Sequence, residues 1–345
     1  MDGLLARLAA SDDPMLAYKA RLLTAWPLAG LQEGSEEARA LRSRIATSPM
    51  ARALLSGREP DGTIRPHPYR KWQGPHWTLV SLALIDYPPG DGSLQPIMDQ
   101  VYAWLLAREL PGRRTPAGQE SRARFCASME GNAIWYSIRL GLDDGRTARL
   151  AERLVRWQWP DGGWNCDDRA TAAVSSFQET AIPVRALGAF GQRYGDAPAL
   201  EAAARAAELL LSRRLLWRHR DGQLIEPDWG GRVDRIHFPA QFYDVLFALE
   251  VMAEVGRIGD ERCTDALRLL ESKRLPDGGF PLEEANARKA DTIVSRGSFA
   301  DWGPAGTRRS NPLVSLAAWR VFERRRLASG APSPSSNSNP GPTRP

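Results

Sequence analysis

The stretch Gln158-Trp159-Pro160-Asp161-Gly162-Gly163-Trp164 decides the fold, because its Pro-Asp-Gly turn recurs along the chain. Further copies lie at 60–62 and 276–278, and Arg220-Asp221-Gly222 is a degenerate copy. An Asp-Gly pair favours a tight turn, since glycine accepts positive φ and aspartate can hydrogen-bond its own backbone. The later copies recur at intervals of roughly 50 to 60 residues, which is typical of arrays of helical hairpins.

Apolar periodicity divides the expected helices into two alternating sets. The strongly apolar set is expected at 14–27, 75–87, 128–141, 178–192, 238–256 and 310–326. The second set is richer in Ala, Glu and Arg and is expected at 36–56, 94–108, 146–158, 197–213 and 260–274. A helix that is apolar all round is buried on more sides, so we expect the first set inside and the second set outside.

Six inner and about five outer helices, with no strand pattern between them, predict an all-α fold, an (α/α)6 toroid. The alternative is an open superhelical array of helix pairs, which usually has shorter repeats and short loops. The loops expected before inner helices are long, as at 280–309. Long loops gathered at one rim favour the closed ring.

Composition limits the class of protein. The chain has 345 residues, 43% of them hydrophobic and 25% charged, which fits one large toroid domain over 1–327. The segment 328–345 is rich in Ser and Pro and is expected to be a disordered tail. Arginines scattered among acids argue against a nucleic-acid partner. Neither a signal peptide nor a transmembrane run is visible, and three cysteines without a disulfide framework favour the cytoplasm.

The order Gln, three residues, Gly, any residue, Trp at 158–164 resembles the repeat of squalene and hopene cyclases. The β subunits of protein prenyltransferases share this repeat more loosely, and Ser176-Phe177-Gln178-Glu179-Thr180-Ala181 resembles the inner-helix start that follows it. The resemblance implies a toroid that acts on an isoprenoid-like or otherwise apolar substrate in a central cavity, and a partner subunit could complete the site. The Asp-rich motif with which the cyclases protonate an alkene is absent, so squalene-type cyclisation is not expected.

The same resemblance implies zinc as a candidate cofactor, because related toroids bind it with Cys, His and Asp near inner-helix starts. Cys126 precedes one expected inner helix, Cys166 follows the Gly-Gly-Trp turn, and His237 precedes another inner helix. We therefore expect these three residues as metal ligands of a zinc-dependent, thiol-alkylating enzyme. The alternative is that each cysteine is a small buried hydrophobic residue.

Three carboxylates, Glu130, Glu179 and Asp244, are the candidate catalytic acids and bases, since each is expected near the start of an inner helix. They also allow a carbohydrate-active ring, which needs two carboxylates across a cleft. Sugar rings could then stack on Trp77, Trp135 and Trp229.

The remaining alternative is a ring that binds a peptide or lipid without catalysis. Its recognition loop would be Pro66-His67-Pro68-Tyr69-Arg70-Lys71-Trp72, where aromatic and basic groups are mixed. The sequence does not decide between these alternatives.

Overall fold

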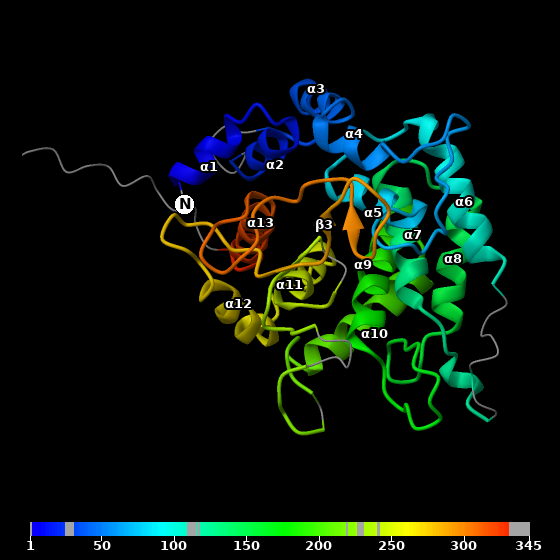
Figure 1. Ribbon diagram of the computed structural model, residues 1–345. Helices are drawn as coiled ribbons and strands as arrows, with labels where there is room; N and C mark the ends of the chain where they lie inside the picture. Colours follow the sequence, from blue (N-terminus) through cyan, green and yellow to red (C-terminus); the bar gives the residue numbers. More distant parts are fainter. Residues whose placement is uncertain are drawn as a thin grey trace, which may run out of the picture.

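The computed structural model describes residues 2–24, 31–108, 115, 118–218, 220–225, 231–239 and 242–330. Regular structure within them is almost entirely helical (Figure 1). The α-helices are α1 Asp2–Ala9, α2 Pro14–Thr24, α3 Glu36–Ile45, α4 Pro49–Leu55, α5 Pro75–Leu84, α6 Gln95–Leu106, α7 Ala127–Arg139, α8 Gly145–Arg156, α9 Phe177–Tyr194, α10 Ala197–Ser212, α11 Val245–Glu254, α12 Thr264–Glu271 and α13 Pro312–Ala328.

Short elements lie in the loops. Three 3-10 turns, η1 Gly92–Leu94, η2 Glu120–Arg122 and η3 Glu261–Cys263, precede helices. Strand β1 (His237–Phe238) pairs in parallel with β2 (Glu284–Ala285), and β3 (Arg288–Lys289) pairs in parallel with β4 (Gly297–Ser298). These two-residue pairs fix loops and add no sheet layer.

Six helices, α2, α5, α7, α9, α11 and α13, form a closed inner ring. Along it α7 packs on α5 and α9, α11 packs on α9 and α13, and α13 returns to α2, while Lys19 of α2 pairs with Asp86 just after α5. Each of α3, α6, α8, α10 and α12 packs on the inner helix that precedes it, and Figure 1 shows α6, α8, α10 and α12 on the outside. The inner helix α5 is buried from Pro75 to Ala83, whereas α8 buries one face. The predicted (α/α)6 toroid is confirmed.

Details of the helix bounds differ from the sequence prediction. The expected outer helix 36–56 is two helices, α3 and α4, because Pro49 lacks an N–H and Ser48 caps a new start by accepting from Ala51 N at 3.1 Å. Helix α1 was not expected and packs on α2. The predicted tail begins inside α13, which continues to Ala328, and 331–345 lie outside the described residues.

The turn motif works as a clamp between helices. The Gln158 amide donates to the carbonyls of Gly162 at 2.7 Å and Ala202 at 2.8 Å, which ties the turn to α10. The indole Nε1 of fully buried Trp164 donates to Leu154 O of α8 at 3.0 Å. The motif therefore fixes the path of the chain from an outer helix toward the next inner helix.

Two copies of the turn share a further contact. Asp161 accepts from the Ser175 hydroxyl at 2.6 Å, just before α9. Asp277 accepts from the Ser310 hydroxyl at 2.6 Å, just before α13. The turn aspartate therefore anchors the far end of the long loop, so that both copies deliver their loop to the same rim of the ring.

Asp86 closes the ring at the opposite rim, after the end of α5. Lys19 of α2 donates to its carboxylate at 2.5 Å, Arg139 of α7 contacts the other oxygen, and Arg42 donates to its carbonyl at 3.0 Å. Although burial raises the pKa of Asp86, Lys19 and Arg139 outweigh burial and hold it well below its usual range. The charged aspartate thus links three helices.

Replacing Asp86 by Asn should lower the free energy of unfolding by about 3 kcal/mol at pH 7, because two cations lose their buried partner. A carboxyl with a depressed pKa stabilises the fold above its unfolded pKa of about 4 and loses this contribution as pH falls. The gap between wild type and variant should therefore shrink below about pH 4. Urea unfolding measures it, with Asp99→Asn in an exposed pair as control; equal effects of both substitutions would contradict the role of Asp86.

Candidate metal centre

Two loops that are far apart in sequence run side by side at the rim where the inner helices α7 and α9 begin. Phe125 N donates to Asn165 O at 3.3 Å, and Arg124 and Asn165 form a parallel bridge. Cys126 and Cys166 each follow directly after this contact. The pairing therefore places the two thiols next to each other.

Glu179 completes the cluster from the first turn of α9. Its side chain is only 6% exposed, and it accepts from Ser128 N in the first turn of α7 at 2.8 Å. One carboxylate oxygen of Glu179 and the two sulfur atoms of Cys126 and Cys166 all lie within 4.8 Å of one another. Three groups with metal-ligand chemistry thus converge at one point.

The cluster carries groups that disfavour each other's charge. Burial raises the pKa of Glu179. The hydrogen bond with Cys126, followed by burial and the Glu179 charge, raises the pKa of Cys166. A bound divalent cation would lower these pKa values instead, because it stabilises the thiolates and the carboxylate together.

The spacing fits zinc. In a tetrahedral site with Zn–S bonds of about 2.3 Å, two sulfur ligands lie about 3.8 Å apart, so a shift of about 1 Å or less would suffice. Both thiols are partly exposed, so solvent reaches the cluster. Three protein ligands with solvent access resemble catalytic zinc sites more than closed structural sites.

Lys71 lies beside the cluster in an aromatic box. Its Nζ is 5.0 to 5.9 Å from the ring centroids of Tyr69, Trp72, Trp77 and Phe242. Burial and the charge of Arg296 lower the pKa of Lys71, and the nearby Glu179 and Cys126 partly offset this. The loop predicted as a recognition segment thus presents a cation at the ring mouth.

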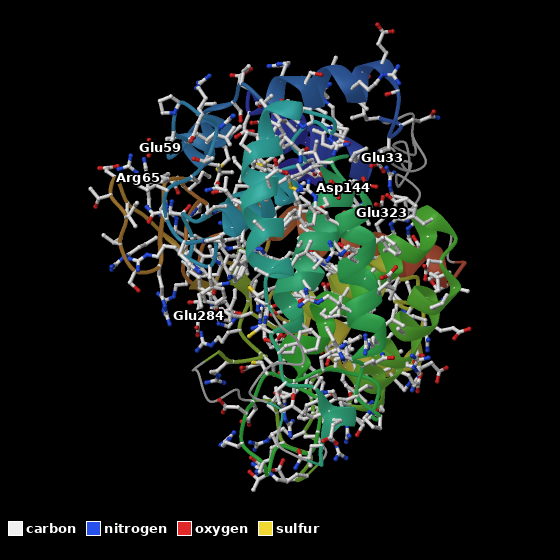
Figure 2. The ribbon with its side chains drawn as sticks, turned by 90° about the vertical axis from the view of Figure 1, so that its right-hand side faces the viewer. Glu33, Glu59, Arg65, Asp144, Glu284 and Glu323 are labelled. Atoms are coloured by element: carbon white, nitrogen blue, oxygen red, sulfur yellow. The ribbon has the colours of Figure 1, made fainter. Side chains whose placement is uncertain are left out.

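His237 lies outside the cluster, contrary to the ligand set expected from the sequence. Its Nε2 is 3.0 Å from a Glu284 oxygen, and its Nδ1 is 3.5 Å from an Asp244 oxygen. Burial lowers its pKa, but hydrogen bonds and charges of these carboxylates outweigh burial and raise it. Glu284 is labelled at the edge of the molecule in Figure 2. The structure therefore brings together Cys126 and Cys166 and adds Glu179, which the sequence suggested only as an acid or base.

Asp244 and Glu130 have local structural partners. Asp244 caps α11 by accepting from Phe247 N at 2.8 Å and also accepts from His237 N at 2.6 Å. Glu130 of α7 is fully buried, and its Oε1 lies 3.0 Å from a guanidinium nitrogen of Arg153 on α8. Glu130 thus faces the outer layer, where burial raises its pKa to about 7.

Two of the three tryptophans expected to stack on sugars, Trp77 and Trp135, are already covered by other side chains or buried. Trp77 is buried and donates to Tyr69 O at 2.9 Å, while Trp135 is covered by the Arg185 guanidinium at 3.7 Å from its centroid. Trp229 lies outside the described residues. Tyr69, by contrast, is 42% exposed at the rim, and its signal in sequence was the mixed aromatic and basic loop.

Comparison with known proteins gives a fold likeness only. No family model matches the chain, and no curated protein matches it. Solved structures that resemble it include a UGL variant with dGlcA-Glc-Rha-Glc (TM-score 0.38, 14% identity, 92% of this chain and 85% of that chain). A second is the Lin0763 protein from Listeria innocua, with a TM-score of 0.44 and 12% identity over 92% of this chain and 86% of that chain. A third is an unsaturated glucuronyl hydrolase from Bacillus sp. GL1, responsible for the degradation of glycosaminoglycan, with a TM-score of 0.36 and 14% identity over 92% of this chain and 85% of that chain.

These findings correct the function expected from the resemblance. A terpene cyclase-like or prenyltransferase-like activity on an isoprenoid-like or apolar substrate is wrong: two of the similar structures are named for a glucuronyl hydrolase and its saccharide. The physical reason lies at the rim, where Lys71, Glu179 and two thiols gather, since desolvating charged groups against an apolar molecule is costly.

No helix in the described part of the chain is long and apolar enough to cross a membrane.

Replacing Glu130 by Gln should flatten the dependence of stability on pH. A carboxyl whose pKa is raised from 4.5 to about 7 stabilises the fold below pH 4.5 and loses this contribution as pH rises toward 7. The loss amounts to about 3 kcal/mol at most. Burial also raises the pKa of Glu250 to about 7, so the variant should keep part of the dependence of stability on pH. Urea unfolding from pH 4.5 to 8 measures the slope, with exposed Glu201→Gln as control; identical slopes for wild type and variant would refute the assignment.

Proposed function

We propose that this chain is a zinc-dependent enzyme whose metal is bound by Cys126, Cys166 and Glu179. The observation that carries this proposal is the convergence of three ligand atoms within 4.8 Å from three separate segments. A single cysteine or glutamate at the rim is common, whereas burying a carboxyl group against two thiols is costly unless a partner such as a metal ion stabilises the cluster. A reducing compartment keeps two adjacent thiols from forming a disulfide, which agrees with the cytoplasmic location expected from the sequence.

The roles of the surrounding residues follow from their contacts. Bound zinc supplies a Lewis acid that activates an oxygen or sulfur nucleophile. Ser128 N holds one Glu179 oxygen at 2.8 Å and so orients the carboxylate. Lys71, held in its aromatic box, offers a positive charge and N–H donors to an anionic group of the substrate or to charge that develops during the reaction.

Carbohydrate processing is a second candidate, favoured by one feature of this chain. Exposed Tyr69 lies 6.3 Å from the ring of Trp104 and 5.8 Å from the ring of Trp77, which gives the mouth an aromatic surface beside Lys71. A glycosidase also needs two carboxylates across the sugar. Glu179 at the rim offers one such carboxylate.

The test is the metal content of protein purified without chelator and then dialysed against zinc. Wild type should retain about one zinc per chain, because three ligands and a solvent molecule complete a tetrahedral site. The C126S and C166S variants should lose it. The affinity of E179Q for zinc should fall by about 10-fold or more, since even the loss of a residue that only hydrogen-bonds to a metal ligand lowers affinity that much. Elemental analysis and competition with a chromophoric chelator measure these effects.

The matched control is Cys263→Ser, at a buried cysteine whose sulfur lies 3.7 Å from Arg257 O on the outer layer. This variant should keep the metal, and circular dichroism establishes that all variants are folded. A wild type that holds no zinc, or a folded C126S/C166S double variant that retains it, would exclude the metal centre. Glycoside hydrolysis that persists in chelator would favour the second candidate.

A further inference from the structure

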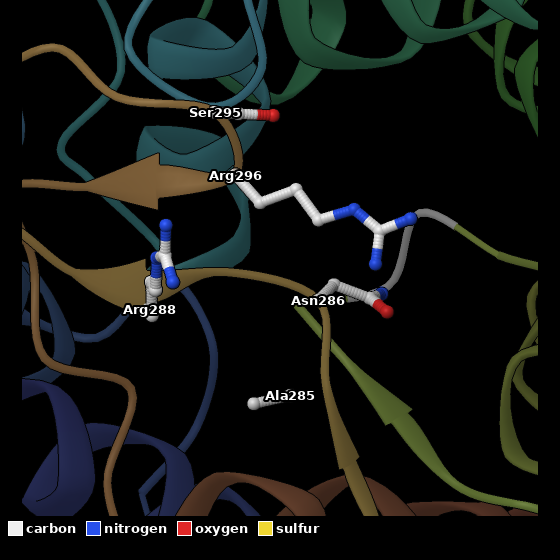
Figure 3. Close-up of a pocket in the computed structure, with 5 residues that line it drawn as sticks. All are labelled: Ala285, Asn286, Arg288, Ser295 and Arg296. Carbon is white, nitrogen blue, oxygen red and sulfur yellow. The ribbon is translucent and has the colours of Figure 1, made fainter.

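The loop between α12 and α13 contains a pocket of about 240 Å³ with two arginines, Arg288 and Arg296, on its wall. Figure 3 shows the Arg296 side chain extended across the pocket toward Asn286, with Arg288 on the other side. Neither guanidinium has a carboxylate partner among the residues that the structure describes. The pocket therefore carries two positive charges that no carboxylate in the described part of the chain neutralises.

The pocket is built on fixed backbone. Arg288 N donates to Arg296 O at 3.0 Å within the β3–β4 pairing, and the Asn286 amide donates to Pro239 O at 2.7 Å. Arg296 has a φ of 56°, a left-handed conformation that is unfavourable for a side chain of this size. Such strain persists only where the surroundings hold it, and it clusters at ligand-binding sites.

The arginine pocket is joined directly to the aromatic box beside the metal centre. Trp72 Nε1 donates to Asn286 O at 2.6 Å, and Trp72 N donates to Gly297 O at 3.1 Å. Lys71 precedes Trp72, and its amine lies close enough to both Arg296 and Glu179 to be influenced by their charges. A row of cations, from the arginines to Lys71, thus leads to the cluster of Cys126, Cys166 and Glu179.

We propose that Arg288 and Arg296 bind the oxyanion group, a carboxylate or a phosphate, of a substrate whose reactive end reaches past Lys71 to the metal centre. This inference rests on the proposed zinc enzyme for the reaction, although the binding of the anion does not depend on the metal. Planar guanidinium groups match the geometry of carboxylate and phosphate oxygens, and an anion between like charges relieves their repulsion. Both arginines are exposed on the pocket wall, so an anion can reach them from solvent.

The test is calorimetric titration with two probes, glucuronate and inorganic phosphate, at low ionic strength. Wild type should bind at least one of them, and added salt should weaken the binding. The R288Q/R296Q variant should bind about 10-fold or more weakly, as expected for lost charge-assisted hydrogen bonds. The control is Arg220→Gln, an exposed arginine paired with Asp221, which should bind like wild type.

The outcomes separate the two proposals. Preference for glucuronate assigns a carboxylate substrate, and preference for phosphate assigns a phosphorylated one. A wild type that binds neither probe, or a folded R288Q/R296Q variant that binds as well as wild type, would overturn the anion site. Zinc content is measured in the same samples and should be unchanged in R288Q/R296Q, so a missing metal would count against the proposed enzyme and not against this pocket.

Discussion

The hydrogen bond from Phe125 N–H to the Asn165 carbonyl is the contact on which the candidate site depends, because it holds the loops before α7 and α9 side by side. Two glycines allow this approach. A Cβ at Gly163 would lie 2.4 Å from Thr180 Oγ1, and one at Gly131 would lie 3.0 Å from Pro183 N. The loop and both inner helices therefore pack closer than any larger residue would permit, and the two cysteines and Glu179 meet as a consequence.

Asp86 and Glu179, two buried carboxyl groups at opposite rims of the ring, differ in their partners. At the rim where α5 and α7 end, Asp86 is matched by Lys19 and Arg139 within contact distance. At the rim where α7 begins, about 20 Å away for a helix of this length, Glu179 has no ion pair with a lysine or arginine among the described residues. The first arrangement closes the ring, whereas the second gathers a carboxyl group and two thiols, and for this reason we propose a metal cation there.

Much of the fold could be predicted from the sequence, because the turn motif and helical periodicity are local signals. The chemistry could not, since Trp164 and Gln158 fix a chain path without contacting any substrate, and an apolar substrate inferred from their motif was wrong. Cys126 and Cys166 were expected at the rim, but only the loop pairing makes them meet. His237 was expected with them, yet Asp244, seven residues later, holds its backbone and Glu284 its ring. Neither contact was predicted, because the inner helix was expected from 238 whereas it begins at Val245 with Asp244 as its cap.

X-ray absorption at the zinc edge, measured on zinc-loaded protein, tests the central claim most directly, because it counts the atoms bound to the metal by element. We expect two sulfur atoms at about 2.3 Å and one or two oxygen atoms at about 2.0 to 2.2 Å. A shell of nitrogen and oxygen alone, or of four sulfur atoms, would contradict the centre formed by Cys126, Cys166 and Glu179.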